Sequence, residues 1–312
     1  MTREINLLAR HLFDQHRVPF LGEATIRGIL RYEDLIPAME RALADFSSGK
    51  ALQPVRNILP VEQHHVFFGV MPAVYGDVMG AKLVTLAPDN AGIGLPTHQG
   101  IIVLFRAETG QPIAVMDGRL ITEMRTAAVT AAATKLLAKV NANVLTILGS
   151  GVQARAHFEA LRLVRHFTTI RVWSRNPAHA QALAAEIGGT AASAEDAVRD
   201  ADVVVTVTHA SEPILHGRWL KPGVLVNAVG AVGLANRELD DDAMRGSVVV
   251  DSREAARVES GDIALAGSMV YAELGEILAA KKPKPLAGTT VFKSLGLAVE
   301  DLAAAKLVLD SI

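Results

Sequence analysis

The sequence predicts an α/β protein in two parts, and three observations lead to that prediction. From about residue 143 onward, short valine-rich apolar runs alternate with helix-compatible segments. A glycine-rich turn directly follows the first of these runs, at residues 144–148. The preceding segment instead has a helical stretch followed by several extended ones that turns separate. Continuous apolar strands with helices between them indicate a parallel sheet covered on both faces, whereas the first part indicates an α+β layout with an antiparallel sheet.

The elements expected in the first part begin with a helix over residues 32–48. The extended segments that follow lie at 57–61, 65–70, 82–86, 100–106 and 112–117. In the second part, strands are expected at 144–148, 170–173, 203–207, 224–228 and 248–250. Helices are expected at 153–164, 177–187 and 194–199. The tail, residues 295–312, has an amphipathic pattern and is expected to pack back on the first part.

Composition narrows the possible classes of function. The chain has 312 residues, half of them hydrophobic, which is enough for two cores, yet no run approaches the ~18–20 apolar residues of a membrane span. Lys and Arg number 31 against 33 Asp and Glu, so nothing indicates a nucleic-acid or membrane-surface partner. The absence of cysteine excludes disulfides, thiolate metal sites and a cysteine nucleophile. The start, Met1 to Glu4, lacks a leader-like pattern, so a cytoplasmic location is expected.

The glycine-rich turn at residues 149–154 reads G-S-G-V-Q-A and is followed by a helix-compatible segment. Gly149 permits a tight turn, Gly151 lets the backbone approach a pyrophosphate, and Ala154 keeps the helix close to the strand. The amino terminus of the helix attracts the phosphate charge. Such a string also occurs in structural turns. The strand–turn–helix order favours a nucleotide site, and with it a dinucleotide-binding domain of the Rossmann type.

The end of the second strand bears on which dinucleotide is bound. A fold that selects NAD usually places Asp or Glu there, to bind the ribose 2′-hydroxyl. Here Ser174, Arg175 and Asn176 offer hydroxyl, guanidinium and amide groups instead, which suit a 2′-phosphate. The sequence therefore predicts a preference for NADP(H), with NAD(H) possible. The alternative is an Arg175 that points into water and a site indifferent to the phosphate.

Nine segments match one known family in the right order. They are QPVR at 53–56, GVMP at 69–72, KLV at 82–84, PTHQ at 96–99, MDG at 116–118, RTAA at 125–128, GSGVQA at 149–154, NAVGA at 227–231 and TVFKSLG at 290–296. The chain thus resembles the ornithine cyclodeaminase/mu-crystallin family over nearly its whole length. The resemblance implies a substrate-binding and dimerisation domain formed by residues 1–122 and 293–312, and a Rossmann domain formed by residues 123–292. It also implies a homodimer.

The resemblance implies that three cations, Arg56, Lys82 and Arg125, carry the chemistry by holding a substrate carboxylate. A guanidinium suits this role because it is always charged and binds a carboxylate with two parallel hydrogen bonds. The alternative is that each cation is a solvated surface charge. Lys82 lies between apolar neighbours, which favours an inward orientation. Beside two arginines in a partly desolvated pocket it could exchange protons near neutral pH, and we hypothesise that it helps to protonate the imine or its product.

Other positions match places where the family contacts its cofactor. Thr97 and His98 would reach it from the first domain, and Thr206 and Thr208 would flank the nicotinamide, although a lone histidine in an apolar stretch is more often structural. Ser294 and Lys293 are expected to line the cleft. The full set of expected cofactor-binding residues is Thr97, His98, Arg125, Thr126, Gly149, Gly151, Val152, Gln153, Ser174, Arg175, Asn176, Thr206, Thr208 and Ser294. The pair His64-His65 has no carboxylate at ligand spacing, so no metal site is expected.

One departure from the family pattern bears on the reaction. Cyclodeaminases of the family carry an aspartate base where this chain has Val232. Valine cannot take a proton from an amine, whereas reduction of a preformed imine needs only a hydride and one proton. Nearby Asp240, Asp241 and Asp242 are interpreted as the start of a helix over 238–244, where the helix dipole favours carboxylates.

We therefore expect an NAD(P)H-dependent reductase of small α-imino acids. Hydride would pass to the C=N carbon of a substrate such as a pyrroline- or piperideine-2-carboxylate. One alternative is an ornithine cyclodeaminase that converts ornithine to proline and ammonia with bound NAD. Others are an alanine dehydrogenase-like enzyme and a binding protein without catalytic activity.

Overall fold

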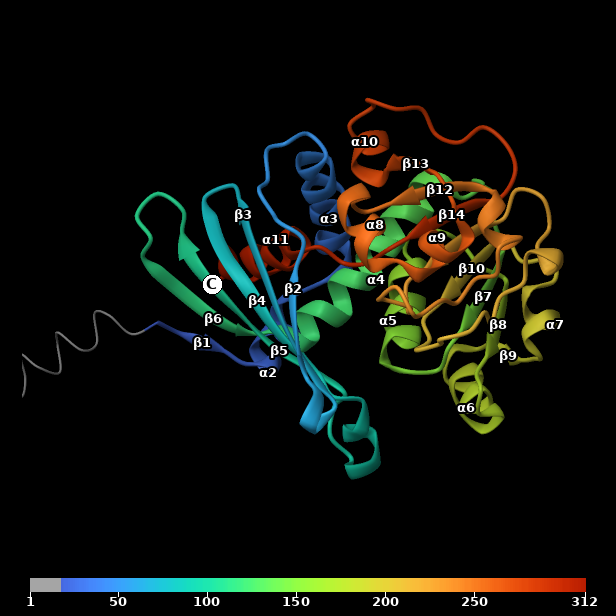
Figure 1. The fold of residues 1–312 in the computed structure, drawn as a ribbon, viewed down its shortest axis with the longest axis horizontal. Helices are drawn as coiled ribbons and strands as arrows, with labels where there is room; N and C mark the ends of the chain where they lie inside the picture. Colours follow the sequence, from blue (N-terminus) through green and yellow to red (C-terminus); the bar gives the residue numbers. More distant parts are fainter. Residues whose placement is uncertain (1–17) are drawn as a thin grey trace, which may run out of the picture.

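The computed structural model describes residues 18–312, which form two sheets and the helices around them (Figure 1). The residues on which the leader expectation rests, and the first 17 of the expected first domain, lie outside this range. Over the described part of the chain, no helix is both long and apolar enough to cross a membrane.

The first sheet has six strands in the order β1-β6-β5-β4-β3-β2, and all neighbours are antiparallel except β1 and β6. Its strands are β1 (Phe20–Leu21), β2 (Asn57–Val61), β3 (Val66–Tyr75), β4 (Val78–Leu86), β5 (His98–Arg106) and β6 (Pro112–Asp117). Short 3-10 turns lie at Glu62–His64 and Pro88–Ile93. The expected antiparallel sheet is confirmed. β3 and β4 are longer than expected because they form one continuous hairpin across residues 66–86.

One face of this sheet is covered by helices. These are α2 (Glu23–Ile29), α4 (Gly118–Leu137) and the carboxyl-terminal α11 (Ala298–Leu309), and α3 (Tyr32–Phe46) packs on α4 and α11. The tail packs on the first sheet as expected: α11 contacts α3, α4, β3 and β4, and in Figure 1 it lies beside these strands. The expected amphipathic pattern is wrong, because every residue from Ala298 to Ala305 is buried, including Glu300 and Asp301.

The second sheet has eight strands, all parallel, in the order β13-β12-β14-β11-β10-β7-β8-β9. The strands are β7 (Val144–Leu148), β8 (Thr169–Trp173), β9 (Thr190–Ala191), β10 (Val203–Thr206), β11 (Leu225–Ala228), β12 (Ser247–Val250), β13 (Val270–Glu273) and β14 (Thr290–Lys293). The helices are α5 (Val152–Leu161), α6 (Pro177–Ile187), α7 (Ala194–Val198), α8 (Arg253–Glu259), α9 (Gly261–Ala266) and α10 (Leu274–Leu278). This confirms the predicted Rossmann-type fold. The prediction missed β9, β13 and β14, the last of which lies between β11 and β12.

The prediction that a helix starts within residues 238–244 is wrong. Only a 3-10 turn forms there, at Ala243–Arg245. The Asp262 carboxylate accepts the backbone N–H groups of Glu238 and Leu239, and Asp240 accepts those of Gly217 and Ala243. The polar groups of this segment are therefore committed to tertiary partners and are not free for a helical ladder.

The order in which the chain adds strands to the second sheet reverses between β7 and β10. β8 and β9 extend the sheet on one side of β7, and β10, β11 and β14 extend it on the other. In parallel sheets, ligands bind beyond the carboxyl ends of the strands at such a switch point. Gly149, which follows β7, has φ +134°, and a Cβ there would lie 2.7 Å from the Val207 carbonyl oxygen. Glycine is therefore required for the turn to pass β10.

Candidate active site between the two sheets

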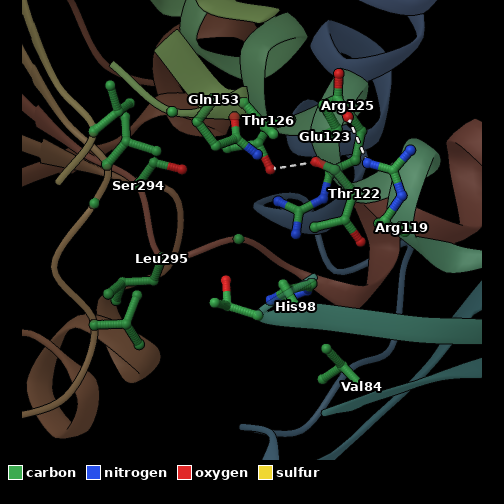
Figure 2. A pocket seen from close by; sticks show the side chains of 18 of the residues that line it. Val84, His98, Arg119, Thr122, Glu123, Arg125, Thr126, Gln153, Ser294 and Leu295 are labelled. Atoms are coloured by element: carbon green, nitrogen blue, oxygen red, sulfur yellow. Dashed lines mark hydrogen bonds and ion pairs between the residues drawn. The ribbon is translucent and has the colours of Figure 1, made fainter. Parts of the chain in front are cut away.

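A cavity of about 620 Å³ lies at this switch point, between the two sheets. Its walls come from both parts of the chain, as Figure 2 shows for side chains on β4, β5, α4 and α5 and in the loop after β14. The expected site residues that line it are Arg56, Lys82, Thr97, His98, Arg125, Thr126, Gly151, Val152, Gln153, Thr208 and Ser294. The structure thus brings together most of the expected site residues at one place.

Lys82 reaches the cavity from the covered face of the first sheet. In β4 it is paired in register with Met71 and Ile102, which also point into the core. Its side chain is 2% exposed, and Nζ lies 2.7 Å from Asp301 Oδ2. A surface lysine, the alternative considered from the sequence, is excluded.

The two arginines are also held by acidic groups that are buried or mostly buried. Arg125 on α4 donates from Nε to Asp301 Oδ1 at 2.9 Å and from Nη1 to Glu300 Oε2 at 2.7 Å. Arg56 pairs with both carboxylate oxygens of Glu259, at 3.0 and 2.9 Å. We refer to Arg56, Lys82 and Arg125 as the clamp. The sequence analysis found its cations but missed the carboxylates, which belong to segments distant in the chain.

The turn after β14 fixes the position of the clamp. The Asp251 carboxylate accepts the backbone N–H groups of Leu295 and Gly296. The carbonyl groups of the same two residues accept Nη2 of Arg56 at 2.7 and 2.8 Å. Gly296 has φ +79°, and a Cβ there would lie 2.5 Å from Nη1 of Arg125. This glycine is required both by its backbone conformation and by the guanidinium packed against it.

Burial and charge change the acidity of the groups in the clamp. Burial lowers the pKa of Lys82 to about 8; Asp301 opposes this shift and Arg125 adds to it. Burial opposes ionisation of Asp301, but Arg125 and Lys82 outweigh it and lower the pKa of that carboxyl group. Burial, with Lys82 and Arg125 adding to it, lowers the pKa of His98 to about 4, so its imidazole is neutral at physiological pH. Lys82 is thus an acid that can release a proton near neutral pH.

Three polar atoms in the cavity wall have no partner. His98 Nε2, Thr122 Oγ1 and Gln153 Oε1 are buried and lack a hydrogen-bond partner within residues 18–312. Buried polar atoms are satisfied in the great majority of cases, so such atoms in a cavity wall indicate a polar ligand. Gly151 caps α5 without a side chain, which leaves the first backbone N–H groups of that helix accessible to a phosphate. These features fit a bound dinucleotide.

Thr206 and Lys293, like Gly149 of the glycine-rich turn, do not line the cavity. Thr206 is fully buried, and its hydroxyl donates to Glu238 Oε2 at 2.7 Å. Lys293 is also fully buried, with Nζ 2.9 Å from Asp262 Oδ2 and within hydrogen-bond reach of the Ala231 carbonyl oxygen. The expectation that Lys293 lines the cleft is therefore wrong. Its charge neutralises Asp262, which holds the backbone at Glu238.

The group expected at the ribose lies at the end of β8, outside the cavity wall. The Ser174 hydroxyl accepts a hydrogen bond from Ser150 at 2.8 Å, and Asn176 caps α6 by accepting the N–H of Ala178. Arg175 is exposed. Ser150 belongs to the glycine-rich turn, so this group adjoins the turn.

Val232 lines the cavity at the position where an aspartate base was considered, and it is 37% exposed. Among the described residues, no group of three or more His, Asp or Glu side chains is arranged to hold a metal. His65 lies 3.4 Å from Asp89 on the exposed surface. Val232 therefore leaves this position of the cavity wall without a group that could act as a base.

Comparisons with known proteins agree with this geometry. The model of the ornithine cyclodeaminase/mu-crystallin family matches residues 19–312. The chain is 48% identical to the ketimine reductase mu-crystallin of Mus musculus, covering 94% of this chain and 96% of the relative. The Thermococcus litoralis Delta(1)-pyrroline-2-carboxylate reductase, in complex with NADH and L-proline, superposes with a TM-score of 0.89 at 35% identity, covering 94% and 96% of the two chains. An archaeal alanine dehydrogenase dimer with bound NAD gives a TM-score of 0.90 at 31% identity, covering 94% and 95%.

Proposed function

The chain belongs to the ornithine cyclodeaminase/mu-crystallin family, and we propose that it is an NAD(P)H-dependent reductase of small cyclic α-imino acids. The observation that carries this proposal is the clamp of Arg56, Lys82 and Arg125, which shares one cavity with the glycine-rich turn. Substrates of the size of pyrroline- or piperideine-2-carboxylate fit both features, since they have one carboxylate and one C=N bond.

The clamp retains donors for a substrate carboxylate. Within the protein, Nε and Nη2 of Arg56 and Nε and Nη1 of Arg125 already donate hydrogen bonds. Nη1 of Arg56 and Nη2 of Arg125 are not engaged by any hydrogen bond of the described residues. These two groups bind and orient the carboxylate, and the carboxylates behind the arginines keep the guanidinium planes fixed.

Reduction of the C=N bond then needs one hydride and one proton. The reduced nicotinamide, when bound, supplies the hydride to the imine carbon. Lys82 supplies the proton to the nitrogen: its ammonium group gives up one proton as the C–H bond forms, so the imine becomes an amine and the lysine becomes neutral. Solvent then restores the proton. Val232 offers no group that could remove a proton from a substrate amine, which disfavours ornithine cyclodeamination.

The cofactor is a nicotinamide dinucleotide, and NADP(H) is its preferred form. Two solved relatives are described with NADH or NAD bound, so the preference rests on this chain's own residues. Ser174, Arg175 and Asn176 offer no carboxylate that would repel a 2′-phosphate, and Arg175 is exposed and free to contact one. Thr97, His98, Thr126, Gln153, Thr208 and Ser294 contact the rest of the cofactor.

We also propose that the two parts of the chain have different roles. Residues 1–122 and 293–312 bind substrate and form the dimer, and residues 123–292 bind the cofactor. Helix α4, Gly118–Leu137, passes through this boundary and carries Arg125. The homodimer is supported by the outer face of the first sheet, where Pro72, Ala81 and Phe105 line an apolar hollow of about 690 Å³. A cytoplasmic location stays a prediction from composition.

The proposed activity predicts which compounds oxidise the reduced cofactor. Absorbance of NADPH should fall with pyrroline- and piperideine-2-carboxylate, and much more slowly with pyruvate plus ammonia. The value of kcat/KM should be higher with NADPH than with NADH. A clear preference for NADH would contradict only the assignment of the 2′-phosphate site and would leave the reductase activity in place. Release of ammonia from ornithine, without net change in nicotinamide absorbance, would show a cyclodeaminase and overturn the reductase.

A further inference from the structure

The clamp is already neutralised by the protein. Behind its three cations lie four buried or mostly buried carboxylates, those of Asp251, Glu259, Glu300 and Asp301. With all of them ionised, the cluster carries three positive and four negative charges. A site with this balance repels the carboxylate of the proposed substrate. The charges therefore conflict with the proposed role of the clamp unless one of the carboxylates is protonated.

Glu300 differs from the other three carboxylates in its partners. Its Oε2 accepts a hydrogen bond from Nη1 of Arg125 at 2.7 Å, while its Oε1 is buried and has no partner. Among the eight oxygen atoms of these four carboxylates, Oε1 of Glu300 is the one with neither a hydrogen bond nor an ion pair within residues 18–312. A proton on this oxygen leaves the hydrogen bond between Oε2 and Arg125 intact.

The surroundings of Glu300 favour its neutral form. Arg125 on α4 is its cationic partner, but Asp251 after β12 and Asp301 in its own helix are negative, and Lys82 on β4 is paired with Asp301. Burial raises the pKa of Glu300 to about 7; Arg125 opposes this shift, and the two aspartates add to it. Asp301 is held ionised by two cations. Glu300 is thus the carboxylate that can change its charge when a ligand arrives.

We propose that the anionic substrate binds to the clamp together with one proton, and that Glu300 takes up this proton. The protonated side chain still accepts from Arg125 through Oε2. It no longer neutralises the guanidinium, whose charge then serves the substrate carboxylate. This inference rests on the proposed function, because it requires a carboxylate ligand at the clamp. It assigns Glu300 a positioning role that acts through Arg125.

The test uses pyrrole-2-carboxylate, a flat carboxylate that NADPH does not reduce readily, and enzyme saturated with NADP⁺. Calorimetric titrations in two buffers of different ionisation enthalpy give the number of protons taken up on binding. For the wild type we expect few protons at about pH 6, where Glu300 is already protonated, and most of one proton at about pH 7.5, where Glu300 is largely ionised and Lys82 still largely protonated. Affinity should fall by about tenfold per pH unit above the pKa of Glu300.

The informative variant is Glu300→Gln, which imitates the protonated side chain. We expect it to lose the proton uptake near pH 7.5, to bind with an affinity that changes little with pH, and to bind about tenfold more tightly than the wild type at about pH 8. A gain in affinity cannot come from a poorly folded protein. Glu254→Gln is the matched control, because Glu254 is an exposed carboxylate on α8 outside this cluster, and this variant should retain the uptake.

Two outcomes would overturn the inference in distinguishable ways. Binding of pyrrole-2-carboxylate without proton uptake in the wild type, or equal uptake in a folded Glu300→Gln variant, would refute the role of Glu300 and leave the reductase in place. No binding of this carboxylate at any pH would remove both the inference and the proposed use of the clamp.

Discussion

At the scale of single residues, Lys82 shows how burial converts an ordinary side chain into an acid. The strand around it is apolar and places it in the core, where the charged form is disfavoured. Asp301 keeps the ammonium in position at 2.7 Å without removing its ability to release a proton. In the proposed reaction the cation is therefore both a part of the carboxylate site and a source of the proton that imine reduction consumes.

Replacement of Lys82 should separate these two roles. We expect Lys82→Met to lower kcat by about 10²–10⁴-fold, because it removes a general acid. In the wild type, kcat should decrease as the pH rises through the lysine pKa of about 8, since the protonated form is active. Lys82→Arg is the control: it should recover KM but not kcat, because arginine holds the carboxylate and does not release its proton. Full kcat in the methionine variant would refute the assignment.

The cations of the site were predictable from the sequence, but their carboxylate partners were not. Arg56, Lys82 and Arg125 lie in segments that match the family pattern, and the apolar neighbours of Lys82 indicate burial. Glu300 and Asp301 lie in a tail whose charged residues suggested a solvent-facing side. Their burial follows from α11 packing against the first sheet on one side and α3 and α4 on the others, which depends on contacts across more than 170 residues of sequence.

At the scale of elements, one carboxylate connects the ends of two central strands. Glu238 accepts a hydrogen bond from Thr206 Oγ1 at 2.7 Å. It also accepts hydrogen bonds from the backbone N–H and the hydroxyl group of Thr208, at 2.7 and 2.6 Å, and both threonines lie at the end of β10. It also accepts the N–H groups of Gly230 and Ala231, which follow β11, at 2.8 and 3.2 Å. Thr208 and Gly230 line the cavity. Glu238 therefore fixes the wall on which the nicotinamide is expected to lie.

Glu238→Gln should disturb this wall while preserving side-chain size. The amide nitrogen cannot accept the N–H and hydroxyl groups that now point at both oxygens, so the free energy of unfolding should fall by about 1–3 kcal/mol. We expect a higher KM for NADPH and a larger isotope effect on kcat with NADPH deuterated at C4, because hydride transfer becomes slower. Glu254→Gln, at an exposed position on α8, is the control and should change neither value. An unchanged isotope effect would leave Glu238 a purely structural role.

The sequence could not predict this connection because the local pattern favoured another element. Three consecutive aspartates after Glu238 suit the first turn of a helix. In the structure, Asp262 and Lys293 form a buried pair, and Asp262 binds the backbone at Glu238 and Leu239. Those contacts come from α9 and β14, and β14 itself was missed. Short runs such as Thr290–Lys293 lack enough periodicity to be recognised as strands before their neighbours are known.

At the scale of the whole molecule, the two-part architecture was the most predictable feature. The valine-rich strands and the glycine turn indicate a parallel sheet from local composition alone, and short turns between extended segments indicate five of the six strands of the first sheet, all except β1. The return of the tail to the first sheet was also expected. What the sequence leaves open is the outer face of that sheet, because alternate residues of its strands are apolar on both faces.

That outer face has the composition of an interface. Pro72, Ala81 and Val103 lie side by side on β3, β4 and β5, and so do Val70 and Leu83, while the buried Lys82 and Ile102 point to the covered face. The outer residues are only partly buried in a single chain. A contiguous apolar patch on a sheet face marks an interaction surface, and the archaeal alanine dehydrogenase of the same fold is a dimer.

A charge at the centre of this face should separate the proposed dimer. The wild type should sediment with about twice the chain mass of 33.1 kDa, whereas Val103→Glu should sediment as a single chain, because the interface would bury an unpaired carboxylate. Leu286→Glu is the matched control: Leu286 is 98% exposed on the loop before β14, and its replacement should leave the mass unchanged. The clamp belongs to one chain, so the separated Val103→Glu protein should still bind pyrrole-2-carboxylate. A wild type that sediments as a single chain would refute the dimer, and a Val103→Glu variant that remains dimeric would move the interface to another face.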